Sequence, residues 1–210
     1  KKKMMNFKKA ILAGAVLCAA CNAFAADEPW HERWTHVYSG QNVHAQFPSN
    51  EYGAEATYEF DNQAFVTGVY HIAKEKSGGT DNNALNSYST LLGGGYTFNA
   101  SVDSKLQFGY MYSDVSVKNV PMGGVRVGTY LDRHLTGTGP MARFVYRLSP
   151  HLVADLFVGR AKYTSDVTVT YSRVGLSYDL TSNVYGRLGF NTAESSGNTA
   201  RQWTVGLGYR

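Results

Sequence analysis

Hydrophobic and polar positions alternate along most of the chain from residue 52 onward. Leu106, Phe108, Tyr110 and Tyr112, for example, are separated by single residues that include Gln107. Because successive side chains of a β-strand point to opposite faces, this spacing predicts a strand with one aromatic face and one small or polar face. The same alternation recurs in the segments 54–60, 141–148, 152–159, 173–180 and 184–190. No stretch after residue 26 is apolar for ten residues, which favours β structure over a membrane-spanning helix.

The alternation predicts nine strands, near residues 52–60, 64–73, 87–98, 104–115, 137–148, 152–163, 168–180, 184–191 and 199–209. Single-chain bacterial barrels usually have an even number of strands. The segment 34–47, in which Val43, Ala45 and Phe47 alternate with polar residues, supplies the missing strand. The sequence therefore predicts an all-β fold, a transmembrane antiparallel up-and-down barrel of ten strands. A barrel of eight strands is the alternative, with the first region forming an arm or a surface helix.

The connections between these strands fall into two kinds. Short polar turns are predicted at 61–63, 99–103, 149–151 and 181–183. The other connections span 74–86, 116–136, 165–166 and 192–198, and two of them are long and rich in Gly, Asn, Ser and charged residues. Short turns at one end and longer loops at the other are typical of outer-membrane barrels, in which the turns face the periplasm.

The composition of the two faces indicates which one points into the barrel. A lumen enclosed by roughly eight to ten strands just accommodates ordinary side chains. The aromatic face is too bulky for such a lumen, since it carries Tyr58, Phe60, Tyr96, Phe98, Phe108, Tyr110, Tyr112, Phe144, Tyr146, Tyr178 and Phe190. We therefore expect this face to contact lipid and the charged face to point inward. The inward face would then pair the carboxylates of Glu55, Glu59, Asp155 and Asp179 with the guanidinium groups of Arg143, Arg147, Arg173 and Arg187.

The N-terminal residues have the pattern of a secretory signal peptide. Five lysines within the first nine residues precede a short apolar run at 10–20, and Ala23, Phe24 and Ala25 fit the small-x-small pattern of a cleavage site. We expect residues 1–25 to be a signal peptide and residues 26–210 to form the barrel domain. The segment 18–21 is a weaker match to a lipoprotein cleavage site.

Removal of this leader would change the charge and the cysteine content. Of 20 basic and 16 acidic residues, five lysines and no acids lie in residues 1–25, which leaves 15 basic and 16 acidic residues. The sequence pI near 9.0 is therefore mostly due to the leader, and no basic patch indicates nucleic acid as a partner. Cys18 and Cys21 both lie in the leader, so we expect no disulfide, cysteine nucleophile or thiolate metal site in the barrel.

The last strand ends with a pattern similar to the signal that outer-membrane barrel proteins present to their assembly machinery. Gln202, Leu207 and Tyr209 match the polar first position and the two closing hydrophobic positions. Thr204 stands where Gly is usual, and Arg210 follows the aromatic residue that normally ends such a chain.

With this pattern, the chain resembles the small outer-membrane β-barrel proteins of the opacity-protein and OmpX-like group. The resemblance covers residues 1–25 as leader and 34–210 as barrel, and it is strongest in the hairpin at 171–190 and in the closing residues 203–209. It implies a location in the outer membrane of a Gram-negative-type bacterium and contact with lipid. It also implies insertion by the barrel assembly machinery and a host or surface ligand at the loops.

Few residues suggest catalysis. Asp132 and His134 lie in the predicted loop 116–136, where an acid and a histidine could activate a water or a serine, and His71 could join them from the outer end of its strand. No nucleophile motif accompanies them, so we expect a solvated loop without catalytic function. The histidines at 31, 36 and 44 do not have a known metal-ligand spacing, and we expect neither a metal ion nor a cofactor.

The sequence thus favours a non-enzymatic outer-membrane barrel with long extracellular loops and a structural, surface-interaction or narrow, porin-like pore role. Two other classes stay open. One is an outer-membrane protease or lipid-modifying enzyme that uses loop residues. The other is a soluble periplasmic barrel that binds a small apolar ligand.

Overall fold

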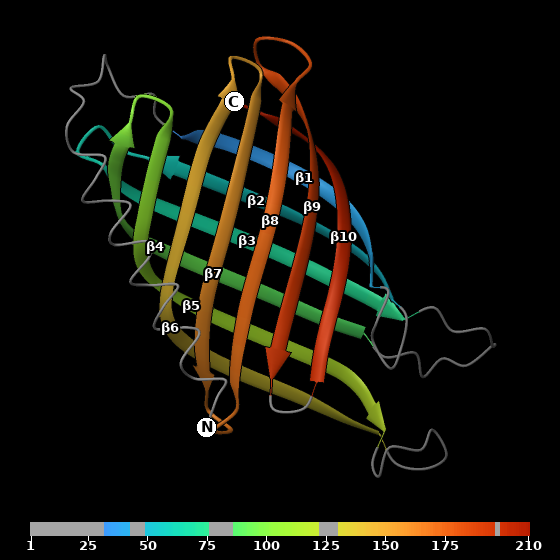
Figure 1. Ribbon diagram of the computed structural model, residues 1–210. Coiled ribbons are helices and arrows are strands. Elements are labelled where there is room, and N and C mark those ends of the chain that lie inside the picture. Colours follow the sequence, from blue (N-terminus) through green and yellow to red (C-terminus); the bar gives the residue numbers. More distant parts are fainter. Residues whose placement is uncertain (1–31, 43–48, 76–85, 122–129, 196–197) are drawn as a thin grey trace.

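Ten β-strands run through the described chain and close into one antiparallel barrel (Figure 1). The computed structural model describes residues 32–42, 49–75, 86–121, 130–195 and 198–210. The strands are β1 (Arg33–Asn42), β2 (Ser49–Glu59), β3 (Ala64–Glu75), β4 (Asn86–Ser101), β5 (Ser104–Pro121), β6 (Tyr130–Ser149), β7 (Leu152–Tyr163), β8 (Thr168–Asp179), β9 (Val184–Ser195) and β10 (Asn198–Tyr209). No helix in the described residues is long and apolar enough to cross a membrane.

The prediction of ten strands is confirmed, and the alternative of eight is wrong. The N-terminal region supplies β1, whose Val37 lies opposite Ala54 of β2 and Leu207 of β10, and this double pairing closes the barrel. The strand predicted at 34–47 starts one residue after the observed strand β1, which begins at Arg33. Its residues 43–47 lie outside the described chain, as does the predicted signal peptide at 1–25.

Short turns gather at one end of the barrel, here called the turn end, with the C-terminus beside them (Figure 1). They are formed by residues 60–63, 102–103, 150–151 and 180–183. Asn62 Oδ1 accepts a hydrogen bond from the N–H of Ala64 (3.1 Å), and Thr181 Oγ1 accepts one from the N–H of Val184 (3.0 Å). Such local side-chain bonds satisfy the backbone within a reversal, which explains why these polar residues end the strands. The strand ends that flank the other connections, together with the short turn at 164–167, lie at the opposite end, here called the loop end.

Three neighbouring strands are longer than the rest, and β5 and β6 project furthest at the loop end (Figure 1). β4, β5 and β6 contain 16, 18 and 20 residues, whereas the other strands contain 10 to 12. A tilted strand needs only about 9–11 residues to cross a bilayer. The predicted loop at 116–136 is therefore wrong, since Ser116 of β5 pairs with His134 of β6. Beyond the bilayer both faces of a hairpin can meet water, so the strands continue there without an apolar face to mark them.

The outer surface of the barrel is apolar and bordered by aromatic residues. On β10 the outward side chains run from Tyr209 at the turn end through Leu207 and Val205 to Trp203, and all four are exposed. Val205 lies opposite Leu188 of β9, so the apolar row between the aromatic borders continues onto the next strand. An apolar band flanked by aromatic girdles is the lipid-facing surface of a transmembrane β-barrel, and a soluble barrel has the reverse arrangement. The protein is therefore of the transmembrane class, and the alternative of a soluble ligand-binding barrel is wrong.

The predicted orientation of the aromatic face is confirmed. Its exposed members are Tyr58, Phe60, Tyr96, Phe98, Phe108, Tyr110, Tyr112, Phe144, Tyr146 and Tyr178. Phe190 is half-buried because its ring packs on Trp203, with the ring centroids 4.7 Å apart.

Candidate functional site

Asp155 of β7 lies at the centre of a group of arginines inside the barrel. Its Oδ2 is 2.7 Å from Nη2 of Arg187 on β9, and its Oδ1 is 3.5 Å from both Nε of Arg143 on β6 and Nε of Arg173 on β8. Strand alternation turns all four side chains inward from four adjacent strands. Only 1% of the Asp155 side chain is exposed. Its negative charge is therefore compensated by these neighbours rather than by bulk water.

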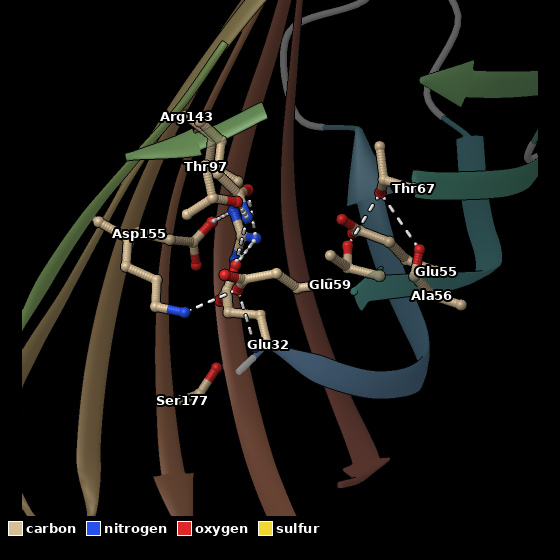
Figure 2. A network of polar contacts seen from close by, with 12 residues as sticks. Glu32, Glu55, Ala56, Glu59, Thr67, Thr97, Arg143, Asp155 and Ser177 are labelled. Atoms are coloured by element: carbon tan, nitrogen blue, oxygen red, sulfur yellow. Dashed lines mark hydrogen bonds and ion pairs between the residues drawn. The ribbon is translucent and has the colours of Figure 1, made fainter. Parts of the chain in front are cut away.

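Further charged side chains extend this group across the lumen (Figure 2). Arg143 Nη1 donates to Glu32 Oε2 (2.8 Å), Arg173 binds Glu55, and Lys105 Nζ is 2.7 Å from Glu59 Oε2. The N–H of Glu32 also donates to Glu59 Oε2 (3.0 Å), which ties the residue before β1 to β2. We call the resulting set the lumen charge network: the carboxylates of Glu32, Glu55, Glu59 and Asp155 and the cations of Lys105, Arg143, Arg173 and Arg187.

The network is packed tightly against neutral side chains. The Trp34 ring lies beneath two of its cations, with the guanidinium carbons of Arg143 and Arg187 5.2 Å and 5.8 Å from the ring centroid. Gly175 provides the space for the central ion pair, since a Cβ at this position would lie 2.5 Å from Asp155 Oδ2 and closer still to the Arg187 guanidinium. A side chain at this position would therefore force the end of Asp155 or Arg187 to shift from the ion pair.

Six of the eight charged residues expected in the lumen lie in this network: Glu55, Glu59, Arg143, Asp155, Arg173 and Arg187. The other two, Asp179 and Arg147, lie nearer the turn end. Asp179 pairs with Arg210 at the turn end, and Arg147, which follows two positions after Val145 on β6, is half-buried at the same end. Both share the inward parity of their strands, but parity gives no information on height within the barrel.

Sequence reasoning missed two members of the network. Lys105 stands two residues before Gln107, on the inward face of a strand whose first residue the alternation had placed correctly, so parity could have identified it. Glu32 precedes β1 and carries no strand pattern. Only the folded chain brings its carboxylate within reach of Arg143 and Gln107, whose Nε2 donates to Glu32 Oε2 (3.0 Å).

Beside the network, the lumen contains a cavity of about 630 Å³ that reaches toward the loop end. Its floor includes the inward ends of Arg173 and Arg187 of the network. One wall is apolar and includes Leu91, Val115, Met141, Phe157 and Val169, next to a buried cluster around Phe65, Met111, Ala161 and Tyr163. The facing wall is polar and includes Asn191, Gln202 and Thr204. The cavity is thus amphipathic, with a charged floor.

A second polar group borders this cavity on β2, β3 and β4. His71 Nε2 is 2.9 Å from Glu51 Oε2, and Ser89 Oγ is 3.4 Å from His71 Nδ1. Ser49 Oγ donates to the other oxygen of the Glu51 carboxylate (3.1 Å). The Tyr38 ring stacks on the His71 ring, with the centroids 6.3 Å apart. His71 and Ser89 line the cavity, whereas Glu51 is buried behind them.

The residues considered from the sequence as catalytic candidates, His71, Asp132 and His134, do not all lie where the sequence placed them. His134 lies on β6 rather than in a loop, and its Nε2 is 2.9 Å from Oδ1 of Asp114 on β5. Both side chains are partly or largely exposed, whereas His71 points into the lumen. Asp132 lies on the same strand as His134, but its side chain is outside the part of the structure that can be described. His71 and His134 are therefore not parts of one site.

Within the described residues, no three His, Cys, Asp or Glu side chains lie close enough together to hold a metal ion. His36 lies in the lumen with its Nε2 3.6 Å from Glu55 Oε2, while residues 31 and 44 fall outside the described chain. Of the proposed assembly-signal residues, Gln202 accepts a hydrogen bond from Asn191 Nδ2 (3.0 Å) on the lumen side, and Leu207 and Tyr209 are exposed on the outer surface.

Comparison with solved structures places this fold among transmembrane β-barrels. The β domain of the Bordetella autotransporter BrkA aligns over 86% of this chain and 98% of its own, with a TM-score of 0.52 and 15% identity. The NanC porin aligns over 84% of this chain and 99% of its own, with a TM-score of 0.48 and 10% identity. Ail of Yersinia pestis, in complex with the heparin analogue sucrose octasulfate, aligns over 87% and 99%, with a TM-score of 0.44 and 12% identity. No protein-family model and no curated protein matches the sequence.

Proposed function

We propose that the protein is an outer-membrane β-barrel with a closed interior, which acts at the cell surface through its loop end and does not form an open pore. The predicted leader at 1–25 would direct export, and lipid would cover the apolar outer band. The barrel assembly machinery would recognise the outward Leu207 and Tyr209, together with Gln202 in the same strand, during insertion.

One observation supports the proposal of a closed interior: the lumen charge network fills the barrel near its turn end. Glu59 and Lys105 are each 1% exposed in their side chains, and the neighbouring Gln107 and Val145 are also fully buried. A conducting barrel has a water-filled polar lumen, in which such side chains would be solvated. The paired charges also leave no excess of one sign to attract ions of the other. A narrow-pore role is therefore the less favoured reading.

The projecting β5–β6 hairpin supports a surface role. It continues well past the length needed to cross the bilayer and carries polar residues such as Asp114 and His134 on its outer face. Segments that project from a rigid scaffold commonly carry binding function. A host or surface ligand at this end is the function class that fits a closed barrel with such a hairpin.

Two measurements test this proposal. An epitope tag inserted at 122–129 should be detected on intact cells, and the same tag inserted at 181–183 should be detected only after the outer membrane is permeabilised. The reverse pattern would contradict the orientation. In planar bilayers the refolded protein should give no stable conductance steps, while the double change Glu59→Ala and Lys105→Ala should open a path for ions. Stable steps from the unaltered protein would overturn the closed interior.

A further inference from the structure

We propose that Ser89, His71 and Glu51 form a hydrolytic relay at the edge of the lumen cavity, and that this relay cleaves acyl esters. The proposal departs from the sequence-based expectation of a non-enzymatic barrel. It uses only residues outside the lumen charge network, so it does not depend on whether the barrel conducts.

The three side chains have the connectivity that activates a serine. The two ring nitrogens of His71 contact different partners, since Nδ1 is 3.4 Å from Ser89 Oγ and Nε2 is 2.9 Å from Glu51 Oε2. A carboxylate accepts from Nε2–H, which leaves Nδ1 with a lone pair to accept the serine proton. A nucleophile bonded to a base that is itself oriented by a third group is the arrangement that nucleophilic catalysis requires.

The burial of the three groups also follows their roles. The Glu51 side chain is only 5% exposed, and its second oxygen is held by Ser49, so the carboxylate is fixed in place. His71 is partly exposed to the cavity, and the stacked Tyr38 ring restricts its rotation. Ser89 lines the cavity beside it. The acid is thus buried and the nucleophile is accessible. A contact between His71 and Glu51 that only stabilised the fold would not need a serine hydroxyl beside the second ring nitrogen of His71.

The surroundings of Ser89 indicate the substrate class. Val115 lies directly opposite Ser89 on β5, and Leu91 is the next inward residue along β4. Both belong to the apolar wall of the cavity, which continues to Phe157. The cavity volume of about 630 Å³ is in the range of small-molecule sites. An acyl chain would lie along this wall with its ester carbonyl at Ser89, and the alcohol part would face the polar wall or the loop end.

The reaction balances with water as the only co-reactant. Ser89 Oγ attacks the ester carbonyl carbon while its proton passes to His71 Nδ1. The tetrahedral intermediate then breaks its bond to the alkoxide, which leaves as the alcohol with the proton from His71. Water attacks the acyl-serine and gives a proton to His71. The acyl–Oγ bond breaks, the carboxylic acid leaves, and His71 returns the proton to Ser89.

The test uses the full chain refolded in detergent micelles, with p-nitrophenyl octanoate as substrate and a fluorophosphonate as covalent probe. We expect turnover by the unaltered protein and labelling at Ser89, located by mass spectrometry. Ser89→Ala and His71→Asn should each lower kcat/KM by about 1,000-fold or more and prevent labelling. Thr90→Ala is the matched control, because Thr90 follows Ser89 on β4 but lies on the outer face, opposite the exposed Tyr70 of β3. It should stay within about threefold of the unaltered protein.

A heat-modifiable gel shift establishes that each variant is folded, so that loss of activity is not confused with loss of structure. The proposal is overturned if the folded, unaltered protein neither hydrolyses the ester nor reacts with the probe. It is also overturned if Ser89→Ala retains activity, or if Thr90→Ala loses as much as Ser89→Ala does.

Discussion

Replacing Asp155 by asparagine should destabilise the barrel strongly, because this carboxylate is shared by three arginines. Asn keeps the size of the side chain and removes its charge. Arg187, at 2.7 Å, would lose its direct partner, whereas Arg143 and Arg173 would keep Glu32 and Glu55. Removing one member of a buried ion pair typically costs about 3–5 kcal/mol, and the partial compensation here favours a value of about 3 kcal/mol.

The assay is urea unfolding of the refolded protein in lipid vesicles, followed by tryptophan fluorescence. With a slope of about 1–3 kcal/mol per M, a loss of 3 kcal/mol would lower the midpoint by about 1 M or more. Asp166→Asn is the control, since Asp166 pairs with Lys162 at 3.2 Å but is 90% exposed, and its loss should not change the midpoint measurably. If Asp155→Asn shifts the midpoint no further than this control does, the network does not hold the barrel together as argued.

Two more substitutions test the outer surface and the space within the network. Leu176→Arg should prevent assembly into the membrane, measured as loss of the heat-modifiable form, because an arginine near the bilayer midplane costs about 2–4 kcal/mol. Leu148→Arg, at the turn end, should assemble normally, and equal yields would contradict the lipid-facing assignment. Gly175→Ala should lower the unfolding midpoint, because the added Cβ would lie 2.5 Å from Asp155 Oδ2. Gly186→Ala is the control and should leave the midpoint unchanged, because the atom nearest to its added Cβ is 3.8 Å away. A shift of the same size in both variants would show that crowding beside Asp155 is not the cause.

The fold could be predicted where a strand separates lipid from the lumen. A two-residue period in hydropathy marks such a strand, and the predicted segments 152–163 and 168–180 agree with β7 and β8 to within one residue for this reason. This period is lost where the contrast between lipid and lumen ends. Ser116 and His134 belong to strands, but both faces of their hairpin meet polar surroundings, so the sequence there has the composition of a loop. Pairing between strands, rather than hydropathy, extends β5 and β6.

The charged interior could be predicted in part, because parity gives the face but not the height of a residue. Arg143 and Asp155 meet because the register between β6 and β7 places Asp155 opposite Val145, two residues along β6 from Arg143, so that the two side chains are diagonal neighbours on the inward face. Arg147 and Asp179 share the parity of their strands and lie at the turn end instead. The hydrogen bond between His71 and Ser89 likewise depends on their direct opposition in the β3–β4 register, which no single strand pattern contains.

Tryptophan quenching by brominated phospholipids tests most directly the claim that the apolar face contacts lipid and the charged face fills the lumen. The chain contains Trp30, Trp34 and Trp203. Trp203 is 61% exposed on the outer surface, whereas Trp34 is 8% exposed beneath the lumen arginines. Single-tryptophan proteins are made by changing the other two to phenylalanine and are inserted into vesicles with bromine on the acyl chains. The account predicts strong quenching of Trp203 and little quenching of Trp34. Strong quenching of Trp34 with Trp203 unaffected would contradict it.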